Sequence, residues 1–125
     1  MFRSLNVLGQ PLAPCSHDPK TGWFRDGCCN SDANDRGLHV VCARVTAEFL
    51  DHLQARGNDL VTPALEHGFP GLSPGDQWCV VAVSWLDAYR AGKACPVVLE
   101  STHQAALAVV PLEVLMAHAF GGAEA

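Results

Sequence analysis

The sequence predicts an α+β fold with a small three- or four-stranded sheet, three or four short helices and a long irregular N-terminal segment. An apolar run rich in β-branched and aromatic residues fills 76–85, and strand-like and helix-like patterns alternate along the rest of the chain. The helical stretch that follows this run is shorter than the roughly dozen residues of a parallel crossover, which favours α+β. A small α/β sandwich is the alternative.

Residues 1–37 are predicted to be irregular, because Gly and Pro recur too often there for any regular element of more than a few residues. Such a long irregular segment is uncommon in a compact domain, and it must pack on the core to be ordered. At 125 residues the chain has the length of one domain, 1–125, and 121–125 is expected to fray.

The regular elements follow in order. Residues 39–45 read as a strand, and a helix over 46–56 begins at Thr46, a good N-cap, and stops at Gly57-Asn58. The run over 76–85 reads as the central strand, buried on both faces.

The second half continues the alternation. Ser84 is expected to cap a helix that ends at Gly92, and 96–100 reads as a third strand with Pro96 at its first position. Ser101 with Gln104 makes a capping box for a further helix, and Pro111 opens a last amphipathic helix.

Charge and hydropathy exclude several classes of partner. The net charge is −5 with no cluster of Lys or Arg, so nucleic acid is not expected as a partner. No run approaches the roughly 20 apolar residues of a membrane-spanning helix, and the N-terminus does not resemble a signal peptide. We therefore expect a cytoplasmic protein with no membrane partner, and homo-oligomerisation is left open.

The six cysteines are then expected to be thiols, metal ligands or reactive groups and not disulfides, because the cytoplasm is reducing. A metal-binding hypothesis starts from Cys15-x-His17, Cys28-Cys29 and His39-x-x-Cys42, and it retains Cys28, His39 and Cys42 as candidate ligands, with zinc as the expected ion. The chain has no Cys-x-x-Cys pair and adjacent cysteines rarely share one ion, so the alternative is that Cys42 is a buried strand residue and His39 a polar residue at a strand start.

A thiol-dependent enzyme is a second hypothesis. Cys28 or Cys29 lies in a loop beside Arg25, which would lower the pKa of a thiol there, and a histidine nearby in space would act as base. His103 directly follows a predicted strand, where ligands often bind, and the helix N-terminus favours its neutral form. The alternatives are loop packing for the two cysteines and a solvated helix residue for His103.

An ordered set of short motifs spans the chain from about residue 5 to 118. The set includes Thr21-Gly-Trp-Phe-Arg-Asp-Gly-Cys-Cys29, Gly57-Asn-Asp-Leu60, Phe69-Pro-Gly-Leu72 and Trp78-Cys79. With these motifs in this order, the chain resembles the bacterial family catalogued as domain of unknown function 2237. The resemblance implies a stand-alone soluble protein and brings no activity with it.

Two positions depart from the family pattern: Val81 stands where a second cysteine is frequent, and His17 where a residue that is no metal ligand is usual. Both departures weaken a metal site built on those positions. A ligand site that remains compatible with the pattern consists of Arg25, Asp26, Cys28, His39, Cys42 and His103.

The function that the sequence favours is a small ligand- or metal-binding domain whose N-terminal loop folds over the strand ends. A structural or interaction module with Trp23 and Phe24 as anchors is the first alternative, and a thiol-dependent enzyme is the second. No motif assigns a reaction, so whether the protein is an enzyme is left open.

Overall fold

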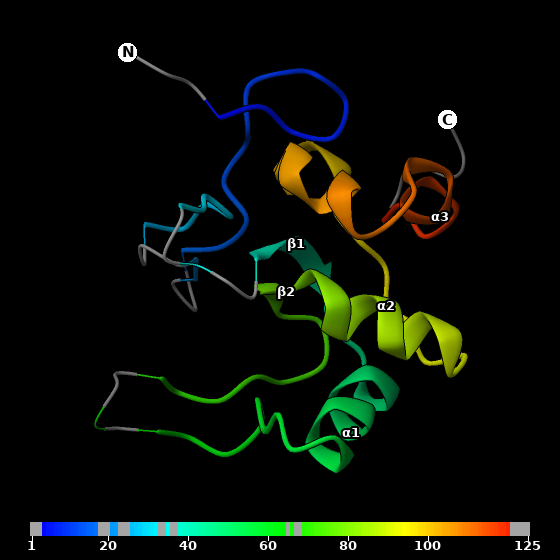
Figure 1. Ribbon diagram of the computed structural model, residues 1–125. Coiled ribbons are helices and arrows are strands. Elements are labelled where there is room, and N and C mark those ends of the chain that lie inside the picture. Colours follow the sequence, from blue (N-terminus) through cyan, green and yellow to red (C-terminus); the bar gives the residue numbers. More distant parts are fainter. Residues whose placement is uncertain are drawn as a thin grey trace.

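The structure is a computed structural model that describes residues 4–17, 21–22, 26–32, 35, 38–64, 66 and 69–120. The described residues form an α+β fold built on one two-stranded antiparallel sheet with three α-helices (Figure 1). The α+β class is therefore confirmed, whereas the third and fourth strands are not found in this part of the chain. None of the helices formed by the described residues is long and apolar enough to cross a lipid bilayer.

The sheet pairs β1 (His39–Arg44) with β2 (Gln77–Val81). Cys42 lies directly opposite Cys79, and the register shifts between His39 and Val41, which is a bulge of the kind that redirects a neighbouring side chain. β2 is shorter than the predicted strand over 76–85, because the backbone turns into a helix at Ala82.

The predicted third strand is an extended segment without strand pairing of its own, since Val97 forms only isolated bridges. It nevertheless follows the second edge of β1: the Arg44 amide donates to the Pro96 carbonyl at 2.9 Å and the Val98 amide to the Cys42 carbonyl at 2.8 Å. The chain then tightens at once into the 3-10 helix η2 (Leu99–Ser101), which limits the pairing to these residues.

The α-helices are α1 (Ala47–Ala55), α2 (Ala82–Arg90) and α3 (Leu112–Ala117). Thr46 is the N-cap of α1, as predicted, because its side chain accepts from the Phe49 amide. Ser84 is not a cap: α2 begins two residues earlier, and its N-cap Val81 makes no side-chain hydrogen bond. The helix predicted after Ser101 is the 3-10 helix η3 (Gln104–Ala108), capped by His103.

The core lies between the helices and the sheet and is centred on Trp85 of α2, which is fully buried. Phe49 and Leu53 of α1 and Leu115 of α3 are buried in the same cluster. The Trp85 indole nitrogen donates to the Cys95 carbonyl at 3.1 Å, so the largest core side chain has its polar atom satisfied.

The N-terminal segment packs beside residues 100–104, which come just after the extended segment along the second edge of β1 (Figure 1). The Val7 amide donates to the Thr102 carbonyl and the Gln104 amide to the Leu5 carbonyl, both at 2.9 Å. Asn6 is buried, donates to the Glu100 carbonyl at 3.0 Å and accepts from two amides of its own loop. These contacts hold residues 4–17 without any helix or strand among them.

Candidate functional site: a cavity beside a bridged cysteine cluster

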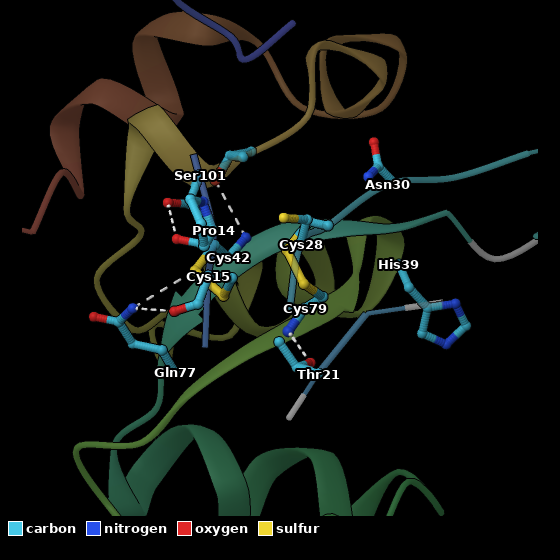
Figure 2. The surroundings of a disulfide bond; sticks show 12 residues. Pro14, Cys15, Thr21, Cys28, Asn30, His39, Cys42, Gln77, Cys79 and Ser101 are labelled. Carbon is cyan, nitrogen blue, oxygen red and sulfur yellow. Dashed lines mark hydrogen bonds between the residues drawn. A yellow bond between two sulfur atoms is a disulfide. The ribbon is translucent and has the colours of Figure 1, made fainter. Parts of the chain in front are cut away.

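Four of the six cysteines form two disulfide bonds, which corrects the expectation of free thiols. Cys15 pairs with Cys42, and Cys29 with Cys79, with Cα–Cα distances of 5.7 and 5.3 Å that suit disulfides (Figure 2). A two-stranded sheet offers few backbone partners to a long irregular segment, and these bonds tie that segment to both strands instead.

Because Cys29 and Cys42 are in disulfide bonds, two of the predicted functional cysteines have no free thiol. Cys42 and Cys29 are both completely buried, so neither is an exposed ligand or nucleophile in this form. Cys28 keeps a free thiol and is half-buried. Burial, together with the Asp26 carboxylate, raises the pKa of Cys28, opposite to the lowering expected from Arg25, which lies outside the described residues. A smaller thiolate fraction at neutral pH weakens the thiol-enzyme hypothesis.

Asp26 and His103 have local structural partners. The exposed Asp26 carboxylate accepts from the Cys28 amide at 3.0 Å, which holds the turn before the vicinal cysteines. His103 Nδ1 accepts from the Ala105 amide at 2.9 Å, and burial lowers the pKa of His103, so the neutral ring caps η3. The anchors proposed for an interaction module, Trp23 and Phe24, lie outside the described residues.

His39 is the predicted site residue that borders a cavity. The cavity has a volume of about 400 Å³, a size usual for small-molecule sites. It lies between β2 and the loop that follows α1, and His39 points away from Cys15 and Cys42 in Figure 2. The lining includes Gly22, His39, Asn58, Asp59, Phe69 and Trp78.

A buried carboxylate orients the His39 ring. Asp35 Oδ1 lies 2.6 Å from His39 Nδ1, and its Oδ2 accepts from the His39 amide at 2.9 Å and from the Ser31 hydroxyl at 3.0 Å. Burial would raise the pKa of Asp35, but the hydrogen bonds from His39 and Ser31 outweigh it and the pKa is lowered. The ionised carboxylate makes Nδ1 the donor, so in the neutral ring the lone pair is on Nε2.

The remaining walls combine aromatic surface with one negative charge. The rings of Phe69 and Trp78 meet at a centroid distance of 5.1 Å and a tilt of 59°. A hydrogen bond from the Thr62 side chain, together with those from the Thr62 and Val61 amides, lowers the pKa of Asp59 to about 2, so this carboxylate is charged at neutral pH. From the sequence, Asn58 is predicted only as part of a helix stop and Trp78 as part of a buried strand, and no function is assigned to Asp59.

The fold and this cavity define a small α+β domain with a disulfide-bridged N-terminal segment and a cavity of ligand size. The chain belongs to the family described as an uncharacterized protein conserved in bacteria (DUF2237), whose model matches residues 5–119. The resemblance inferred from the ordered motifs is thereby confirmed. No curated protein matches the chain.

Asp35 gives the site a testable pH dependence. Because its pKa is lower in the folded than in the unfolded protein, its stabilising contribution is present above about pH 4 and is lost as the pH falls through the folded-state pKa. Asp35→Asn is expected to lower the free energy of unfolding by about 2 kcal/mol at pH 7, because a charge-assisted hydrogen bond is removed. Urea unfolding at a series of pH values measures the difference.

The expected difference between wild type and D35N begins to shrink below about pH 4, where Asp35 of the unfolded chain becomes protonated. It reaches its low-pH value once the pH is below the lowered folded-state pKa of Asp35, where both side chains are neutral. Asp51→Asn, at an exposed position of α1, is the control and is expected to change stability by less than about 0.5 kcal/mol. A difference between wild type and D35N that is constant from pH 7 to acid would contradict an ionised Asp35.

Proposed function

We propose that the protein is a small-molecule-binding domain and that the cavity between β2 and the loop after α1 is its ligand site. The observation that carries the proposal is the meeting of three features in one cavity of about 400 Å³: an aromatic wall, a carboxylate-oriented histidine and a charged aspartate. Ligand sites are mostly apolar with a few placed polar groups, which is this composition.

The lining also indicates the chemistry of the ligand. Phe69 and Trp78 favour a flat apolar body, and His39 adds one polar side chain to the lining. Asp59 is negative at neutral pH and disfavours an anion at the same wall. The preferred ligand is therefore a neutral or cationic molecule with a planar ring.

The test uses three probes that share one ring and differ in charge: tryptamine, indole and indole-3-acetate. Binding is followed by shifts of the backbone amides and the Trp78 indole N–H in two-dimensional NMR spectra of the disulfide-intact protein. We expect tryptamine and indole to bind with dissociation constants of about 1 mM, which is typical of ligands this small, and indole-3-acetate more weakly.

Two variants locate the binding. Phe69→Ala removes half of the aromatic pair and is expected to weaken tryptamine binding about 5-fold, the equivalent of about 1 kcal/mol. Phe120→Ala removes an exposed ring that does not line the cavity and should leave binding unchanged. The proposal fails if none of the probes shifts the cavity residues at several times the expected dissociation constant, or if F120A weakens binding as much as F69A.

A further inference from the structure

The second feature that points to a ligand is the cluster of four buried cysteines, Cys15, Cys29, Cys42 and Cys79, which we call the cysteine cluster. The sulfur atoms of Cys15, Cys29 and Cys79 all lie within 4.8 Å of one another, and the sulfur of Cys42 is bonded to that of Cys15. Tetrahedral zinc bound by four thiolates at Zn–S of about 2.3 Å places its sulfurs about 3.8 Å apart. The four sulfurs are therefore already gathered on the scale of such a site.

The positions of these cysteines do not depend on the sulfur–sulfur bonds alone. Cys42 and Cys79 are direct cross-strand partners, which places their side chains on one face of the sheet. The Cys42 amide donates to Thr102 Oγ1 at 3.1 Å and the Cys79 amide to Thr21 Oγ1 at 2.9 Å, and both threonines are buried.

Cys15 is held by separate contacts. Its amide donates to the Gly27 carbonyl at 2.7 Å, and its carbonyl accepts from Gln77 Nε2 at 2.6 Å (Figure 2). The same Gln77 nitrogen lies 4.0 Å from the Cys42 sulfur, where its second hydrogen can be donated to a thiolate. Three of the four cysteines thus have backbone anchors that would survive reduction of the disulfides.

We propose that the reduced cysteine cluster is a zinc site, so that the protein exchanges two disulfides for one structural metal according to the redox conditions. Each disulfide takes two electrons and two protons from a dithiol reductant, which itself becomes a disulfide. The four thiols then bind one Zn²⁺ and release four protons to solvent. Soft thiolate ligands in a buried, closed tetrahedral set select zinc over the oxygen-preferring Mg²⁺ and Ca²⁺.

This ligand set replaces the one expected from the sequence. Cys42 remains a ligand, whereas Cys28 is a separate half-buried thiol and His39 lines the cavity. Cys29 alone of the vicinal pair enters the cluster, which agrees with the expectation that adjacent cysteines do not share one ion.

The experiment compares oxidised and reduced full-length protein for zinc and cobalt binding. A phosphine reductant opens the disulfides without competing strongly for the metal. Each phosphine gives two electrons to one disulfide and takes an oxygen atom from water to leave as its oxide, and the two protons of that water end on the two thiols. We expect the reduced protein to retain one zinc per chain after gel filtration, measured by elemental analysis, and the oxidised protein none. Co²⁺ in place of zinc should give the thiolate charge-transfer and intense visible bands of a tetrahedral sulfur site.

Alanine variants identify the ligands. Cys15→Ala and Cys79→Ala should each weaken zinc binding more than about 100-fold, beyond what losing an outer-sphere contact costs. Cys28→Ala and Cys95→Ala are the matched controls, since both remove a cysteine outside the cluster, and should bind zinc as wild type does. If a cluster variant fails to fold, the cobalt spectrum of the reduced wild type still reports the number of thiolate ligands.

Three results would overturn the proposal: a reduced wild-type protein that retains no zinc, a cobalt spectrum without thiolate charge transfer, or binding that is lost in C28A. A reduced protein that unfolds and is not refolded by Zn²⁺ counts as the first of these. The cavity proposal is tested on the oxidised protein, so either one can fail while the other holds.

Discussion

Replacing both Cys29 and Cys79 with alanine is expected to lower the free energy of unfolding of the oxidised protein by about 4 kcal/mol. The bond closes a loop across a sequence separation of 50 residues, and closing such a loop restricts the unfolded chain by this amount in the chain-entropy model. The Cys15–Cys42 bond spans 27 residues, so the corresponding double variant should lose about 3.5 kcal/mol. A domain of this size has only about 5–15 kcal/mol in total.

Urea unfolding without reductant measures both losses. The control is the double variant Cys28→Ala with Cys95→Ala, which removes two thiols and keeps both bonds. Cys95 is completely buried, so this control should lose about 1 kcal/mol through lost packing. If the bond-deleting variants lose no more than the control, the disulfides contribute nothing beyond the packing of their sulfur atoms.

The sequence predicts the fold class and the first strand and helix well, because these depend on local patterns. The apolar run of β1 and the Thr46 N-cap of α1 can each be predicted from a few consecutive residues. The predicted third strand illustrates what local patterns miss. Residues 96–98 have a strand composition, but whether they pair depends on the turn into η2 at Leu99, which follows them.

The cysteine pairing is not readable from spacing, because every bond joins the irregular segment to a strand far along the chain. The even count of six cysteines in the whole chain was the available signal, and the expected reducing compartment argued against it. The cavity was missed for a related reason: its lining comes from both strands, from the loop after α1 and from Gly22 of the N-terminal segment, and only His39 had been singled out as a site residue. Asp35 orients the His39 ring, and this role depends on a contact that exists only in the folded chain.

Gly22→Ala is expected to lower the free energy of unfolding by more than about 3 kcal/mol. Gly22 has φ of +105°, where a side chain is strained by about 1–2 kcal/mol. A Cβ at this position would also lie 2.3 Å from the Cys28 carbonyl oxygen, so the backbone next to Cys29 must move. Gly75→Ala is the matched control, because its φ is +98° but nothing lies within 4 Å of the added Cβ. It should lose only the strain of about 1–2 kcal/mol.

A local measurement separates the clash from the strain. The Cys79 amide donates to Thr21 Oγ1 and the Gly27 amide to the Thr21 carbonyl, so displacing the chain beside Gly22 should speed hydrogen exchange at both amides. Gly75→Ala should leave their exchange unchanged relative to global stability. Equal losses in the two glycine variants, with equal exchange at Cys79, would mean that the close approach of Gly22 to Cys28 does not exist in solution.

Because Gly22 lines the cavity and its neighbour Thr21 holds Cys79, this contact joins the proposed ligand site to the cysteine cluster. The variant should therefore weaken tryptamine binding as well as stability.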